Sequence, residues 1–113
     1  MNVYNETSGL HQHAQDIERE IAERLIDKVL ADGHEVSVHE GEDWAIRESM
    51  DRDAILASMA STDSDKVYIW KDGERKGWFW LIYGNGNDLI SDFVSNSYCC
   101  EAVNHAIQEE LFT

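Results

Sequence analysis

Residues 67–94 carry the pattern that most restricts how this chain can fold. Two apolar and aromatic runs, Val67–Trp70 and Trp78–Tyr83, are separated by a polar segment that contains Asp72-Gly73. Asp and Gly accept the positive φ angles that a tight hairpin turn needs. The segment 84–87, Gly-Asn-Gly-Asn, provides a second turn before a third apolar run. The sequence therefore predicts a three-stranded antiparallel meander.

Apolar residues at helical spacing predict helices on both sides of this meander. The longest helix is expected from Gln12 to Ala31, a short one from Asp51 to Ser61, and a last one after Ser97, which can cap it. Between the first two, Glu35–His39 alternates Val with polar residues, as expected for a short edge strand. The segment that follows, which carries Trp44, is expected to be a polar loop.

The order of these elements indicates an α+β domain. We expect the meander and the short edge strand to pack against an N-terminal, a short middle and a C-terminal helix. At 113 residues and 42% apolar content, the chain is long and apolar enough to fold as one domain over residues 1–113. Residues 1–10 carry no such pattern and are the candidate disordered segment.

The second strand of the meander is apolar on both of its faces. Trp78 and Trp80 lie on one face, and Phe79 and Leu81 lie on the other. One face should cover the helices. The other is covered either by the rest of the domain, including the loop with Trp44, or by a partner chain. Trp44, Trp78 and Trp80 are therefore the candidate aromatic anchors of an interface.

Charge is distributed very unevenly along the chain, whose net charge is −14. Segments 1–34, 35–66 and 84–113 carry −4, −6 and −5, whereas 67–83 carries +1. Such a surplus repels nucleic acid and anionic membranes and attracts basic protein surfaces. The expected partner is a basic nucleic-acid-binding protein, with no direct contact to nucleic acid or membrane.

The acidic residues form two candidate binding groups. Asp16, Glu20, Glu23 and Asp27 follow one another at steps of four, three and four, which places them on one face of the first helix. Such a row can imitate a nucleic-acid backbone, and it can equally be a solvated helix face. The second group lies in the loops and comprises Glu40, Glu42, Asp43, Asp63 and Asp65.

The sequence contains no enzyme signature that we could identify. No Cys-x-x-Cys or His-Glu-x-x-His spacing is present, and the loop acids do not continue into a calcium-binding loop. We therefore expect no metal, no cofactor and no catalytic residue. Cys99 and Cys100 are adjacent and have no other cysteine as a partner, so they are expected to be reduced thiols, in agreement with a cytoplasmic protein.

Two stretches of the chain carry a resemblance. The segment Trp78–Gly86 with Ile90–Phe93, preceded by Gly41–Trp44, resembles small acidic proteins carried by phages, plasmids and other mobile elements. In size and acidity the chain is also similar in type to phage-borne inhibitors of restriction or CRISPR systems, some of which imitate DNA. The resemblance implies a stoichiometric protein inhibitor and transfers no site residues.

Two functions of different classes follow from these patterns. The preferred one is an acidic inhibitor that occupies the nucleic-acid channel of a host defence protein. The alternative is a homodimeric domain that uses its aromatic sheet face, with acidity serving solubility alone. A small hydrolase or metal enzyme is a distant third.

Overall fold

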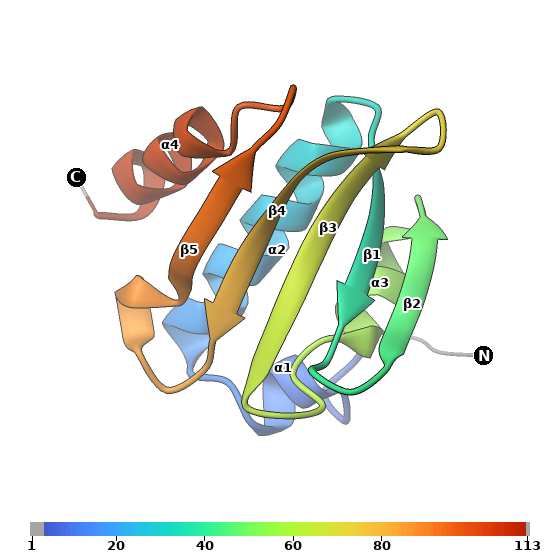
Figure 1. Ribbon diagram of the computed structural model, residues 1–113. Helices are drawn as coiled ribbons and strands as arrows, with labels where there is room; N and C mark the ends of the chain where they lie inside the picture. Colours follow the sequence, from blue (N-terminus) through green and yellow to red (C-terminus); the bar gives the residue numbers. More distant parts are fainter. Residues whose placement is uncertain (1–3, 113) are drawn as a thin grey trace.

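Every strand of the sheet runs antiparallel to its neighbours, in the order β2-β1-β3-β4-β5 (Figure 1). The computed structural model describes residues 4–112. The strands are β1 (Glu35–His39), β2 (Trp44–Ser49), β3 (Ser64–Lys71), β4 (Glu74–Ile82) and β5 (Ile90–Ser95). The helices are α1 (Gly9–Gln12), α2 (Asp16–Ala31), α3 (Arg52–Ser58) and α4 (Cys100–Phe112), and a 3-10 turn, η1, spans Gly86–Asp88. The α+β class is confirmed, with one strand more than expected.

The predicted meander is confirmed as β3, β4 and β5. Tyr68 of β3 lies opposite Trp78 of β4, and β4 pairs in turn with β5. The turn between β3 and β4 is made by Asp72 (φ 53°) and Gly73 (φ 78°). Positive φ at both central residues is what a type I′ hairpin turn requires, so the local sequence determines this connection.

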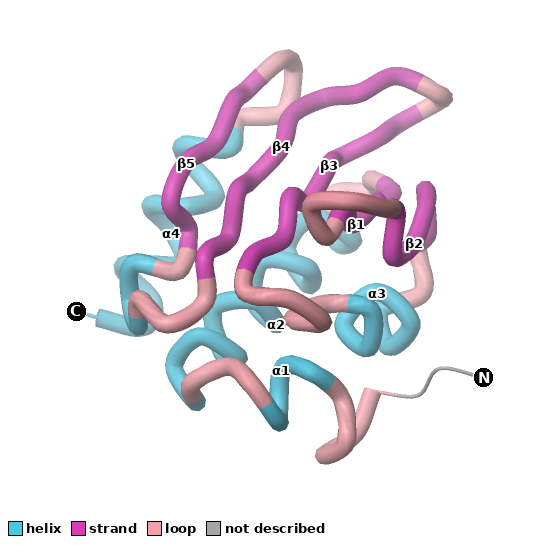
Figure 2. Tube along the Cα trace, turned by 60° about the horizontal axis from the view of Figure 1, so that its bottom comes forward, coloured by secondary structure: helices cyan, strands magenta, loops and turns pink. Residues whose placement is uncertain are grey.

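The two faces of the sheet have different surroundings. The helices lie on one side of the sheet (Figures 1 and 2), which we call the helical face, and no helix within residues 4–112 covers the opposite side, the open face. Strand side chains that point to the helical face are fully buried: Val36, Val38, Val67, Ile69, Phe79 and Leu81. They form one core with buried helix residues, among them Ile21, Leu25, Ile26, Val29, Ile55, Leu56 and Ile107. The alternation of β4 therefore directs Phe79 and Leu81 inward, as predicted.

The N-terminal helix is shorter than predicted and is preceded by a separate helical turn. The expected helix Gln12–Ala31 is interrupted after α1 and restarts at α2. Gln15 caps α2 in a capping box, because its backbone N–H donates to the Glu18 carboxylate at 2.9 Å while its side chain accepts from a first-turn amide. Within the candidate disordered segment, the structure describes residues 4–10, and Leu10 is fully buried. Residues 1–3 lie outside the described part.

The strand Glu35–His39 is confirmed but lies inside the sheet, between β2 and β3, so its expected edge position is wrong. The edge is formed by β2, where a polar loop was expected. Trp44 pairs with His39, and Ile46 pairs with Val38, with register shifts on both sides of Val38. Because of this irregular pairing, the apolar residues of β2 do not keep the regular alternation by which strands are recognised in a sequence.

The remaining helices begin close to the expected residues. Asp51 caps α3, and its side chain accepts from the Ala54 amide at 3.3 Å. The last helix begins at Cys100, later than a cap at Ser97 would place it. The Cys100 amide donates to the Ser95 hydroxyl at 2.9 Å, so the end of β5 holds the start of α4.

Glu18 connects the first long helix to the turn between β4 and β5. Its carboxylate is fully buried, and Oε2 accepts hydrogen bonds from the backbone amides of Gly84 (2.7 Å), Asn85 (2.9 Å) and Gly86 (3.1 Å). Oε1 accepts the fourth, from the Gln15 amide. Three successive amides that converge on one oxygen form an anion-binding nest, and here the anion belongs to the protein itself.

We predict that Glu18→Gln lowers the free energy of unfolding by about 2–3 kcal/mol. The amide has one acceptor oxygen in place of two, so a backbone donor is left buried without a partner. Urea unfolding would measure the loss, with Glu20→Gln on the exposed side of α2 as the matched control at less than about 0.5 kcal/mol. Equal losses in the two variants would contradict the role of the nest.

Candidate interaction surface

Aromatic side chains gather on the open face of the sheet. Five of them project from β2, β3 and β4 on this side: Trp44, Tyr68, Trp70, Trp78 and Trp80. The rings of Trp44 and Tyr68 are 5.3 Å apart between centroids. Trp80 is 36% exposed, and Val94 of β5, the cross-strand partner of Trp78, is 39% exposed. The structure thus brings together the three predicted anchors, and the helices leave them uncovered.

Cations lie over these rings. The Arg47 guanidinium is 5.1 Å from the Trp44 ring centroid, and the Arg75 guanidinium is 4.7 Å from that of Tyr68. The Lys66 ammonium lies over two indoles, at 5.3 Å and 5.6 Å. Within residues 4–112, none of these three cations forms an ion pair with a carboxylate. The open face therefore carries positive charge held on aromatic rings.

The cations of the helical layer behave differently, because they pair with acids. Arg24 and Lys28 of α2 both bind Glu110 of α4, at 2.9 Å and 2.6 Å. Arg52 of α3 binds Asp27 of α2 at 2.6 Å. These pairs are partly exposed, so each contributes little to stability, but they neutralise acids on that side of the molecule. Positive charge without an acidic partner is thus concentrated on the open face.

The predicted row of acids on α2 is largely engaged within the protein. Asp16 pairs with Arg19, Asp27 pairs with Arg52, and Glu23 accepts a hydrogen bond from the Tyr4 hydroxyl at 2.8 Å. Burial, together with the Glu23 carboxylate, raises the pKa of Tyr4. Glu20 is exposed and has no ion pair in the described part of the chain. The row belongs to the helical layer, away from the aromatic anchors.

Four of the predicted loop acids meet at one end of the sheet. The turn between β1 and β2 carries Glu40, Glu42 and Asp43, and the loop between α3 and β3 carries Asp63. The two segments are joined because the Ser61 hydroxyl donates to the Glu40 carboxylate at 3.1 Å and the Thr62 hydroxyl to its carbonyl oxygen at 3.0 Å. No lysine or arginine within residues 4–112 pairs with any of the four acids. We call this group, Glu40, Glu42, Asp43 and Asp63, the acidic rim.

Asp65 does not belong to the acidic surface, which corrects the prediction. It is 1% exposed, and its Oδ2 accepts from the Ala60 amide at 2.8 Å and the Tyr83 hydroxyl at 2.6 Å. Burial raises the pKa of the Asp65 carboxyl, although both hydrogen bonds act in the opposite direction. The alternation of residues along β3 could have indicated that Asp65 is buried, because position 65 shares the inward face of this strand with Val67 and Ile69.

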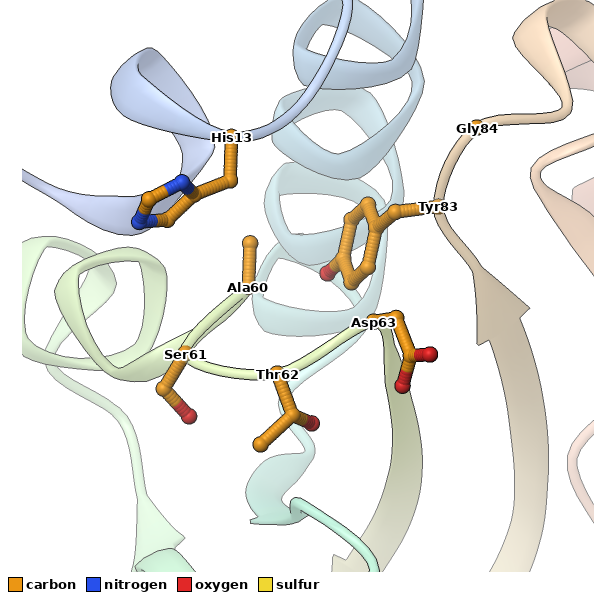
Figure 3. A pocket seen from close by; sticks show the side chains of 7 residues that line it. All are labelled: His13, Ala60, Ser61, Thr62, Asp63, Tyr83 and Gly84. Atoms are coloured by element: carbon orange, nitrogen blue, oxygen red, sulfur yellow. The ribbon is translucent and has the colours of Figure 1, made fainter.

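A pocket of about 370 Å³ lies next to the hydrogen bond between Asp65 and Tyr83 (Figure 3). His13 borders it on one side and Tyr83 on another, while Ser61, Thr62 and Asp63 line the loop between them. No hydrogen bond joins any two of these side chains within residues 4–112. The same part of the chain contains no group of three or more His, Cys, Asp or Glu that could hold a metal ion. The pocket therefore lacks a paired nucleophile and base in this arrangement.

The two cysteines differ in their surroundings. Cys100 is buried, and its Sγ lies 3.5 Å from the Val94 carbonyl oxygen, while Cys99 is exposed. Burial raises the pKa of the Cys100 thiol. His105 lies 3.0 Å from Glu109, and no hydrogen bond joins it to either thiol in the described residues. Cys100 is thus a packing residue at the start of α4.

Comparison of the chain with models of protein families, with curated proteins and with solved structures found no match. Among residues 4–112, no helix has both the length and the apolar character that a membrane crossing needs.

We predict that the stability difference between the wild-type protein and Asp65→Asn depends on pH. Because the folded-state pKa of Asp65 is raised, its stabilising contribution is complete below the pKa of an unfolded aspartate and is lost as pH rises through the folded value. The free energy of unfolding of the wild type should therefore increase relative to that of Asp65→Asn as pH falls from neutral toward acid.

Urea unfolding at a series of pH values would measure this trend. Asp63→Asn, in the exposed loop nearby, is the control and should show no comparable gain. A difference that stays constant with pH, or that grows toward alkaline pH, would disprove the raised pKa.

Proposed function

We propose that this protein is a stoichiometric inhibitor that binds a basic nucleic-acid-binding protein of a host defence system. The net charge of −14 favours a basic partner. The resemblance to proteins of phages and mobile elements supports the choice of a CRISPR or restriction protein as the target. We place the interaction with this target in the cytoplasm.

The observation that carries this proposal is the position of the acidic rim beside the aromatic anchors. The Asp43 carboxylate accepts from the amide of Trp44, and the Trp44 ring contacts His39 at 4.9 Å between centroids. The rim acids thus adjoin the open face. Exposed charges act mainly on association rate and orientation, whereas buried aromatics dominate binding energy. In this proposal the acidic rim attracts the partner, and the neighbouring aromatic surface supplies most of the binding energy.

The rim has a more direct role in this proposal than the row of acids on α2. In that row, three of the four acids already have a partner within the chain, so their effective field is reduced. Glu20 and the exposed side of Asp16 add to long-range attraction. Imitation of a nucleic-acid backbone then depends chiefly on the rim, where no basic side chain of the described residues compensates the charge.

A second candidate function is a homodimer formed through the open face. Trp78 and Val94 are cross-strand partners on this face, and Val94 and Trp80 are among its exposed large apolar residues. Large exposed apolar surface commonly marks an interface. In this case the acidity serves solubility, and the function of the dimer is not specified by its surface.

We predict that reversing the rim in the triple variant Glu42→Lys, Asp43→Lys, Asp63→Lys weakens capture of the basic partner by more than about tenfold. The measurement is affinity capture from bacterial lysate at low and high salt. The captured protein is then tested for loss of nucleic-acid binding when one equivalent of the chain is added.

The matched control changes the same amount of charge elsewhere. Glu6→Lys, Asp88→Lys and Glu101→Lys together alter three exposed acids that form no ion pair in the described structure. Equal weakening in both triple variants would show that net charge alone attracts the partner. A captured protein that keeps its nucleic-acid binding at equimolar inhibitor would disprove the proposed inhibition.

For the homodimer, light scattering provides the test. A dimer whose mass is insensitive to salt, and which Trp78→Ala or Trp80→Ala converts to a monomer, would favour the second candidate. A monomer at all salt concentrations would rule the second candidate out.

A further inference from the structure

The open face is not flat, because two hollows follow one another along β3. The first, about 140 Å³, is lined by Ser37, Trp44, Arg47, Glu48 and Trp70. The second, about 220 Å³, is lined by His39, Gly41, Ser64, Lys66, Tyr68 and Trp80. Trp70 and Tyr68 are two positions apart on one strand and therefore lie about 6.5–7 Å from each other along it. Each hollow combines two aromatic walls with one cation, and the first also contains the Glu48 carboxylate.

Groups that could bind a ligand in these hollows are not used by the protein. Arg47 and Lys66 form no ion pair within residues 4–112, and each lies against an aromatic ring. The indole N–H of Trp70 is buried without an acceptor in the same part of the chain. A buried donor without a partner is costly, so it favours a ligand that offers an acceptor oxygen or nitrogen.

We propose that the open face binds a short single strand of nucleic acid, with bases stacked on the aromatic walls and phosphates on Arg47 and Lys66. Single strands are commonly bound on surfaces that combine aromatic stacking with cations that follow the backbone. The base supplies both a planar ring and acceptor atoms for the Trp70 indole. Two hollows in succession match a ligand that repeats the same planar and anionic units.

The net charge of the chain argues against nucleic acid in general, and carboxylates also lie at this face: Glu48 lines the first hollow, Asp92 is the partner of Trp80 on β5, and the acidic rim adjoins the second hollow. Salt screens exposed charges over about 8 Å at physiological ionic strength, so acids of the helical layer act weakly across the sheet. Arg47 and Lys66, which contact the strand, form no ion pair within residues 4–112. Stacking, which does not depend on net charge, supplies most of the affinity. This inference goes beyond the inhibitor function and stands without it, since the strand binds the isolated chain.

The test is titration of the purified full chain with oligothymidine, with oligouridine and with a duplex of the same length, followed by tryptophan fluorescence. Both single strands should quench the fluorescence, and the duplex should not. Trp80→Ala should weaken binding by roughly tenfold, as expected for loss of one stacked base. Lys66→Gln should reduce the slope of log affinity against log salt by about 0.7, the contribution of one phosphate contact.

Arg24→Gln is the matched control, because it removes one cation from the helical layer, where it pairs with Glu110. Its affinity and salt slope should equal those of the wild type. Circular dichroism of Trp80→Ala identifies any unfolding, and the salt slope of Lys66→Gln provides an independent readout. The proposal is overturned if no single strand quenches at the lowest salt, if the duplex binds equally, or if Arg24→Gln changes the slope as much as Lys66→Gln.

Discussion

The buried carboxylate of Glu18 is the interaction on which much of this structure depends. It receives four backbone amides, from Gln15 and from residues 84–86, and so joins the start of α2 to the turn that follows β4. A charged group without water requires such partners. Once that turn is held, Tyr83 reaches Asp65, and Asp65 holds the Ala60 amide. One acidic network therefore links a helix, two strands and the loop that carries Asp63 of the acidic rim.

This network lies at one end of the sheet. The two faces of the sheet differ in the groups that their charged side chains contact. Helices cover one face, where Arg24, Lys28 and Arg52 neutralise neighbouring acids. On the opposite face Arg47, Lys66 and Arg75 rest on aromatic rings. A chain of net charge −14 thus presents an aromatic surface whose rings carry three cations without ion pairs in residues 4–112, bordered by an acidic rim.

Sequence patterns predicted the parts of the fold in which local preference and tertiary packing agree. The meander follows from two aromatic runs and the Asp72-Gly73 turn, and the inward direction of Phe79 and Leu81 follows from alternation. The patterns failed where pairing is irregular or where a break has no proline or glycine to mark it. The polar strand β2 depends on its pairing with β1, and the interruption before Gln15 depends on the capping box with Glu18. The aromatic residues of the open face were singled out from the sequence, whereas Asp65 was assigned to the surface because the inward start of β3 was not recognised.

By itself, the sequence determined the α+β class, the hairpins, the surplus of acids and the two-sided aromatic character of β4, because each depends on residues that are near one another in the chain. The tertiary structure alone decided which acids are neutralised, which are buried and which remain as a rim. Arg52 meets Asp27 across 25 positions, and Arg24 meets Glu110 across 86. Charge compensation is a matter of distance in space, on the scale of a few ångströms, and no pattern in sequence order specifies it. For the same reason the unpaired cations of the open face became visible only when the strands were placed side by side.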